Sequence, residues 1–197
     1  QRIKDFLAGN KVQFEEVKRL SYEQKLEIAQ HPVSKKLLEI AIEKKSNLIA
    51  SADVITTQEL LDFAEKVGPN IVALKTHIDI ITDFDPDKTI LPLKDIAAKY
   101  NFLLMEDRKF ADIGSTQELQ FSYGMYKISN WADFVTAQVI GGYDSLECFR
   151  NVGVVAILSM SSKGTLTDAN YFEEAQKAAV SHPNVIGGVS QKPVSDD

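Results

Sequence analysis

The sequence contains a single cysteine among 197 residues, and it has no long hydrophobic run. Cys148 cannot form a disulfide within the chain. No apolar run approaches the roughly 18 residues that a helix needs to span a bilayer, and no charged segment followed by an apolar one resembles a secretory signal. We therefore expect a reducing, cytoplasmic setting and no membrane partner.

Basic residues are also too few to suggest a polyanionic partner. The chain has 22 Lys and Arg against 28 Asp and Glu, a net charge of −6, and the charges are scattered. No basic patch is evident, so we expect no nucleic-acid partner. No G-x-G-x-x-G or P-loop motif follows an apolar run, and no His or Cys cluster has metal-ligand spacing, so we predict neither dinucleotide binding nor a metal site.

The sequence does contain a series of short apolar runs, and each of the first five is followed by a helical pattern of apolar residues. This alternation predicts βαβ units and a parallel sheet, and both an open doubly wound sheet and a closed (β/α)₈ barrel fit it. The helical patterns include residues 115–129 and 143–152. The six apolar runs are "NLIASAD", "IVALKTH", "FLLMEDRK", "ADFVTAQ", "VVAILSM" and "VIGGVSQ".

We expect one domain, since 197 residues with 44% hydrophobic content suit a single core. Residues 1–30 are rich in charge and are interpreted as a linker or lead-in helices, and residues 31–197 as the sheet-forming domain. Pro32 predicts the first turn of a helix. His31 and His182 each precede a proline and are expected at the surface.

Charged and polar side chains stand where the strands of the predicted sheet end. In either fold the ligand site lies beyond the carboxyl ends of the strands, so these side chains should converge. A solvated loop is the bland alternative for any one strand end, but repetition at three consecutive strands weakens it. The residues concerned are Ser51, Asp53, Lys75, His77, Asp107, Lys109 and Ser161.

Two carboxylates alternating with two ammonium groups suggest a specific chemistry. A substrate carboxylate placed near Asp107 would meet like charge, at a cost of about 4 kcal/mol for charges roughly 4 Å apart at an effective dielectric near 20. Loss of that carboxylate as CO₂ relieves the repulsion. Lys109, on the same side if the chain stays extended, would stabilise the carbanion and protonate it.

Several segments closely resemble orotidine 5′-monophosphate decarboxylase of the eukaryotic type. The lead-in "IAQHPVSKKLL" is similar to the decarboxylase half of animal bifunctional UMP synthase, and the resemblance runs from about residue 31 to the end. The Asp-x-Lys-x-x-Asp signature, with Lys75 one strand earlier, is its most specific part. The matching segments are "ASADV" (50–54), "ALKTHIDIITDF" (73–84), "FLLMEDRKFADIGST" (102–116), "NWADFVTAQ" (130–138) and "SMSSKGTL" (159–166).

The resemblance implies a (β/α)₈ TIM barrel, of which this chain holds about six strand–helix units, and a homodimer. It also implies conversion of orotidine 5′-monophosphate to UMP and CO₂, in pyrimidine biosynthesis, without metal or organic cofactor. Lys109 would be the proton donor to C6 of the pyrimidine, and Asp107 would crowd the departing carboxylate. Asp53 and Lys75 would hold the ribose hydroxyls.

Further roles come from the same resemblance. Asp112 would reach into the neighbouring subunit's site, with Thr116 beside it. Ser161 would recognise the edge of the pyrimidine, next to Met160. Ser51 and His77 complete the expected set of substrate-binding residues on the ground of their strand-end positions, and a structural hydrogen-bonding role is the alternative for His77.

The chain departs from the family pattern in two places. Gln138 stands where the family usually has His, away from the proton-transfer residues. The sequence ends just past the sixth predicted strand, so we expect the seventh and eighth strands, with the phosphate-gripping loop, to come from residues beyond 197 or from a second chain. Whether a phosphoribosyltransferase domain precedes Gln1 is left open.

Two alternatives stay open. A sibling decarboxylase of the same superfamily shares Asp-x-Lys-x-x-Asp but uses Mg²⁺, held by a Glu at the end of the second strand, where this chain has Lys75. The other alternative is a non-catalytic barrel fragment that binds nucleotides or a partner subunit. The intact set of charged residues is less expected of a binding module.

Overall fold

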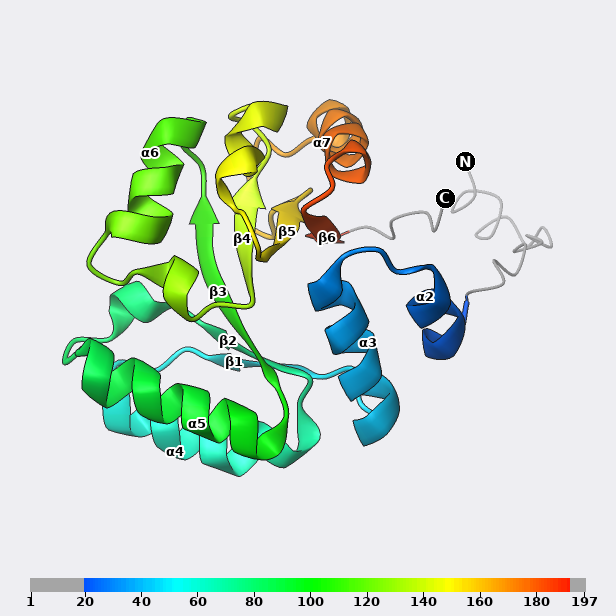
Figure 1. The fold of residues 1–197 in the computed structure, drawn as a ribbon. Coiled ribbons are helices and arrows are strands. Elements are labelled where there is room, and N and C mark those ends of the chain that lie inside the picture. Colours follow the sequence, from blue (N-terminus) through cyan, green and yellow to red (C-terminus); the bar gives the residue numbers. More distant parts are fainter. Residues whose placement is uncertain (1–19, 192–197) are drawn as a thin grey trace, which may run out of the picture.

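A computed structural model describes residues 20–191, and these form one parallel six-stranded sheet. The strand order is β1-β2-β3-β4-β5-β6, so each strand pairs with its neighbours in sequence (Figure 1). All six strands predicted from the apolar runs are confirmed. The strands are β1 (Ile49–Ala52), β2 (Ala73–Thr76), β3 (Leu103–Phe110), β4 (Phe134–Gln138), β5 (Gly153–Ile157) and β6 (Val185–Val189).

An α-helix follows β1, β2, β3 and β5, as the alternating pattern predicts, whereas only a 3₁₀ turn follows β4. Thr56 caps α4 through a reciprocal capping box with Glu59, and Asn101 ends α5 in the left-handed conformation. The α-helices are α2 (Tyr22–Ile28), α3 (Pro32–Lys44), α4 (Thr57–Val67), α5 (Leu91–Tyr100), α6 (Gly114–Glu118) and α7 (Ala169–Ser181). Shorter 3₁₀ or π turns are η1 (Gly68–Asn70), η2 (Ile78–Ile80), η3 (Pro86–Ile90), η4 (Leu119–Tyr123), η5 (Ile128–Asn130) and η6 (Tyr143–Cys148).

Two of the predicted helices are shorter than expected. The pattern over residues 143–152 yields only the 3₁₀ turn η6, because Phe149 leaves the helical region and Asn151 adopts a positive φ of 66°. The pattern over residues 115–129 divides into α6, the π turn η4 and, after Gly124 ends the helical run in extended conformation, the 3₁₀ turn η5.

The sheet buries a different apolar cluster on each face. On one face, outward side chains such as Leu74, Leu104 and Val135 pack with residues of α4, α5 and α7. On the other face, Met105 and Phe134 pack with Ile40 of α3. Because successive side chains of a strand alternate between faces, these two clusters identify which residues of each strand face which layer.

Helix α3 covers the second face of the sheet at its amino end. His31 caps the helix by accepting a hydrogen bond from the Val33 amide, and Pro32 occupies the first turn, as predicted. Figure 1 shows α3 on the side of the sheet away from α4 and α5. Within the described residues, the apolar side chains that pack with α3 do not extend to the carboxyl end of this face.

The structure describes only part of the segment 1–30, which was interpreted as a linker or lead-in helices. Residues 1–19 lie outside the described part of the chain, while residues 20–30 contain the short helix α2. Ser21 and Gln24 cap α2 reciprocally. None of the helices in the described range 20–191 is long and apolar enough to cross a membrane.

The expected surface position of His182 is wrong. Its side chain is buried, its ring lies 4.6 Å from that of Tyr143, and its Nδ1 accepts a hydrogen bond from the Asn184 amide. Burial lowers the pKa of this imidazole. The proline that follows ends α7 but does not bring the histidine to the surface.

Candidate active site

The charged side chains at the ends of β1, β2 and β3 meet, as the strand-end pattern predicts. Lys75 Nζ donates to Asp107 Oδ2 at 3.1 Å, and Lys109 Nζ donates to the same oxygen at 2.7 Å. Asp53 Oδ1 lies 3.5 Å from Lys75 Nζ. His77 Nε2 lies 3.1 Å from Lys75 Nζ and 3.3 Å from Asp107 Oδ2. We call these five residues the charged cluster.

Strand alternation explains why the cluster forms on one face of the sheet. Lys75 shares a face with Ala73, and Asp107 shares a face with Met105; both apolar residues belong to the cluster that packs on α3. The two strands are in register with Lys75 opposite Met105. The apolar half of this face is therefore covered by α3, and the charged half lies at the carboxyl ends of the strands.

Asp107 is held as an anion at the centre of the cluster. Burial alone would raise its pKa, but hydrogen bonds from Lys109, Thr136 and Lys75 outweigh burial and bring the pKa below its ordinary value of 3.8. Its side chain is only 10% exposed. Thr136 Oγ1 on β4 donates to Asp107 Oδ1 at 2.7 Å, so both carboxylate oxygens are bound. Sequence reasoning did not identify Thr136, although it lies on the strand next to Asp107.

Lys109 reaches the cluster through an unusual backbone. Sequence reasoning assumed an extended chain, but Lys109 has a φ of +50°, and the pairing of β3 with β4 is irregular between Glu106 and Phe110. A non-glycine residue in this conformation costs free energy, and such residues gather at functional sites. The Lys109 amide donates to Thr136 Oγ1 at 3.0 Å, which fixes the irregular segment to β4.

Other predicted site residues lie outside the charged cluster. Ser51 is exposed and pairs in register with Lys75. Asp112 is exposed, and its Oδ1 accepts a hydrogen bond from the next amide, that of Ile113. Thr116, on α6, is half-buried. Their predicted roles remain predictions.

Met160 and Ser161 follow β5 at the same end of the sheet. Met160 is half-buried and Ser161 exposed. Gln138 Nε2 lies 3.8 Å from Met160 Sδ, and Gln138 Oε1 accepts a hydrogen bond from Tyr171 on α7. Gln138 therefore links the ends of β4 and β5 to α7.

Glu106 is a second residue that sequence reasoning passed over. It is fully buried on the opposite face of β3 from Asp107. Its Oε2 lies 2.6 Å from Thr76 Oγ1, and its carboxyl oxygens accept hydrogen bonds from the Ile78 amide at 3.2 and 3.1 Å. Burial, the largest cause, raises the pKa of Glu106 to about 8. A glutamate inside the apolar run "FLLME" was the signal that could have indicated this role.

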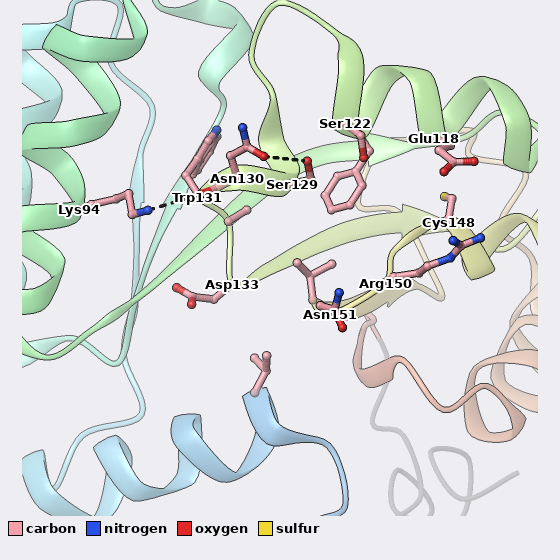
Figure 2. A pocket seen from close by; sticks show the side chains of 14 residues that line it. Lys94, Glu118, Ser122, Ser129, Asn130, Trp131, Asp133, Cys148, Arg150 and Asn151 are labelled. Atoms are coloured by element: carbon pink, nitrogen blue, oxygen red, sulfur yellow. Dashed lines mark hydrogen bonds between the residues drawn. The ribbon is translucent and has the colours of Figure 1, made fainter.

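A separate cavity of about 460 Å³ lies near the amino ends of β4 and β5. Figure 2 shows Lys94 on one side of it and Arg150 and Glu118 on the other. Asp133, which also lines it, accepts a hydrogen bond from the Leu104 amide at 2.7 Å and so has a structural task. Its lining, within residues 20–191, contains no member of the charged cluster. Those residues also hold no group of three His, Cys, Asp or Glu side chains suited to a metal ion.

Comparison with known proteins identifies the family of the chain. The model of the orotidine 5′-phosphate decarboxylase / HUMPS family matches residues 46–195. The chain belongs to this family. The match includes every strand of the sheet and all five residues of the charged cluster.

Relatives named orotidine 5′-phosphate decarboxylase are similar over most of the chain. The protein of Candida glabrata is 43% identical over 182 residues, which cover 87% of this chain and 69% of that protein. The protein of Maudiozyma exigua is 46% identical over 160 residues, covering 77% of this chain and 60% of its own length. This chain thus spans roughly two thirds of the length of these decarboxylases.

Solved structures of the family share the fold. Orotidine 5′-monophosphate decarboxylase from Methanocaldococcus jannaschii, complexed with the inhibitor BMP, aligns with a TM-score of 0.53 at 22% identity, covering 68% of this chain and 61% of that one. The UMP synthase of Leishmania donovani aligns with a TM-score of 0.55 at 18% identity, covering 81% of this chain and 40% of that one. The predicted α/β barrel class is confirmed for the six units present.

Proposed function

We propose that the protein carrying this chain decarboxylates orotidine 5′-monophosphate to UMP and CO₂, in the synthesis of pyrimidine nucleotides and without metal or organic cofactor. The observation that carries the proposal is the ionised Asp107 carboxylate held between Lys75 and Lys109 at the carboxyl ends of the strands. Family membership and the named relatives support the same reaction.

The geometry of the charged cluster suits this chemistry. With the substrate carboxylate beside Asp107, the C6–carboxylate bond breaks, CO₂ departs, and the electron pair stays on C6. The Lys109 ammonium stabilises that carbanion and transfers one proton from Nζ to C6, then regains a proton from water. Asp107 remains ionised throughout, since its lowered pKa keeps it charged at neutral pH.

Contacts with the rest of the nucleotide are assigned to the neighbouring strand ends. Asp53 and Lys75 bind the ribose hydroxyls, with Ser51 and His77 beside them. Ser161 and Met160 meet the edge of the pyrimidine. The position of all these residues at the carboxyl ends of β1, β2 and β5 supports the assignment.

We further propose a homodimer in which Asp112 and Thr116 complete the partner's site. The exposed position of Asp112 is consistent with this, and so are exposed apolar side chains on the same part of the chain. These side chains are Ile113, Leu119, Tyr123 and Met125. We also propose that the enzyme is cytoplasmic and that it is related to the decarboxylase half of bifunctional UMP synthase.

The test is the loss of orotidine 5′-monophosphate absorbance with the wild-type protein and with Lys109→Met, each with and without EDTA. We expect turnover by the wild type that EDTA does not change, and a loss of at least about 10³-fold in kcat for Lys109→Met, since the variant lacks both charge and proton. Lys177→Met, which removes an exposed lysine paired with Glu174 on α7, is the matched control and should turn over normally.

Other outcomes would contradict the proposal in distinct ways. Turnover that EDTA abolishes would contradict a metal-free reaction and indicate a metal-dependent decarboxylation. Nucleotide binding without turnover would indicate a non-catalytic binding protein. Wild-type turnover by a folded Lys109→Met protein would exclude Lys109 as the proton donor.

A further inference from the structure

We propose that Glu106 is a positioning residue for the decarboxylation: from the opposite face of β3 it fixes the end of β2 and thereby the places of Lys75 and His77. This inference rests on the proposed function. It assigns a task to a buried acid that does not touch the charged cluster on the substrate side of the sheet.

The first support is where the backbone ladder between β2 and β3 ends. The last registered pair is Thr76 with Glu106, and β2 ends at Thr76. The next amide toward β3 is that of Ile78, and it donates to the Glu106 carboxyl instead of to a backbone carbonyl. The Glu106 side chain therefore extends the ladder beyond the strand end.

The second support is that the two residues bound by Glu106 lie on either side of His77 in the sequence. Glu106 binds Thr76 and Ile78, and His77 lies between them. Lys75 directly precedes Thr76. Since side chains alternate, holding Thr76 and Ile78 toward the helix layer turns Lys75 and His77 toward Asp107 on the other face. Lys75 Nζ and His77 Nε2 then lie 3.1 and 3.3 Å from Asp107 Oδ2.

The third support is the direction of the hydrogen bonds. Thr76 Oγ1 lies 2.6 Å from Glu106 Oε2 and 3.2 Å from the Met105 carbonyl oxygen. A threonine hydroxyl has one hydrogen to donate. Both contacts are hydrogen bonds when Glu106 carries a proton and donates it to Thr76, while Thr76 donates to Met105. Glu106 thus acts as a neutral acid with a donor and an acceptor in fixed places.

The electrostatic surroundings agree with a neutral acid. The nearby carboxylates of Asp79 on η2 and Asp107 on β3 both oppose its ionisation, and burial opposes it more strongly. Arg108, the next cation along β3, pairs with Asp79 at 3.7 Å instead. A charge at Glu106 would also break the donation to Thr76.

The test compares Glu106→Gln with Glu106→Ala in the protein that carries this chain. Gln can donate to Thr76 Oγ1 and accept from the Ile78 amide, so we expect it to retain most of the wild-type kcat. Ala can do neither, and we expect kcat to fall about 10- to 100-fold with a smaller change in KM, as displaced catalytic groups commonly cause. Thr76→Ser and Thr76→Val form a second such pair if Glu106→Ala does not fold.

A pH profile separates positioning from simple structural support. Between pH 4.5, the ordinary pKa of Glu, and about 8, folded wild-type protein holds one proton more than the unfolded chain at this residue, so its contribution to stability falls as pH rises. The free energy of unfolding of Glu106→Gln should not show this fall with pH. The kcat of the wild type should decline as Glu106 ionises near pH 8, and the kcat of Glu106→Gln should not.

A substrate-free measurement keeps this inference separate from the proposed function. The chain has three histidines, so the imidazole ¹⁵N signals of His77 can be assigned with His77→Gln. We expect them to be unchanged in Glu106→Gln and shifted in Glu106→Ala and Thr76→Val. Unchanged signals and full kcat in folded Glu106→Ala, or equal losses in the Gln and Ala variants, would overturn the inference. Absence of wild-type turnover would contradict only the proposed function.

Discussion

At the scale of single residues, the site depends on one carboxylate that is fully engaged by its neighbours. Asp107 receives hydrogen bonds from Lys75, Lys109 and Thr136, so its ionised form is favoured over the neutral form. Thr136 has no charge, yet it holds the oxygen that the two lysines leave free. Its removal is the simplest way to weaken the anion without altering the charge of the cluster.

Thr136→Val should destabilise the protein at pH 7 by about 1.5 to 3 kcal/mol, since it removes a buried hydrogen bond to a charged group. Because the pKa of Asp107 is lowered on folding, the stability it contributes is present above its ordinary pKa of 3.8 and is lost as pH falls through the folded pKa. The difference between variant and wild type should therefore shrink on acidification to about pH 3.

Urea unfolding at the two pH values measures this difference. Thr82→Val is the matched control, since its exposed hydroxyl donates to the uncharged Ile55 carbonyl. A Thr136→Val difference that is the same at both pH values would show that Thr136 does not act through Asp107.

At the scale of elements, the distortion in β3 is what delivers Lys109 to Asp107. Lys45 and Asn101 also have positive φ, but they end helices, where the left-handed conformation is common. Lys109 adopts it inside a strand, where the backbone gains nothing by itself. The lysine is therefore retained at a conformational cost.

Lys109→Gly should consequently be more stable than Lys109→Ala by about 1 kcal/mol, because glycine tolerates a φ of +50° and alanine does not. Neither variant should turn over substrate. The same pair of substitutions at Arg108, the preceding strand residue, should give the opposite order, since Arg108 does not have a positive φ and glycine loses more conformational freedom on folding than alanine. Equal unfolding midpoints for Lys109→Ala and Lys109→Gly would show that the distortion carries no strain.

The elements also show what sequence reasoning could reach. The apolar runs predicted all six strands, and placing charges at their ends predicted that Asp53, Lys75, Asp107 and Lys109 would meet. The sequence pattern did not predict the positive φ of Lys109, because the hydrogen bond that its amide makes there is to Thr136 on the next strand. The prediction of a helix over residues 143–152 was wrong. Apolar residues have helical spacing there, but the backbone of Phe149 and Asn151 is not helical.

Buried polar groups were the harder part of the site. Glu106 and Thr136 were missed because a partner on a neighbouring strand gives each its role, and one-dimensional patterns do not reveal that partner. His182 was misplaced for a similar reason, since it is buried in contact with Tyr143, a residue distant in the sequence. Long-range contacts therefore account for most of what the sequence did not predict.

At the scale of the whole molecule, the charged cluster and α3 share one face of the sheet. Helix α3 fills its amino end with apolar side chains, which leaves the carboxyl end for the substrate. Within residues 20–191, β1 and β6 each pair with one strand only, so this face is bounded by two strand edges. Exposed strand edges favour aggregation. We therefore expect these two edges to be covered in the protein that carries out the decarboxylation.

The role of Lys109 as proton donor is tested most directly by the release of labelled CO₂ from carboxyl-labelled orotidine 5′-monophosphate, run in D₂O with the wild type and with Lys109→Met. We expect one CO₂ and one deuterium at C6 of UMP for each wild-type turnover, and neither above background for Lys109→Met. Release of CO₂ by folded Lys109→Met at the wild-type rate, with deuterium at C6, would contradict it.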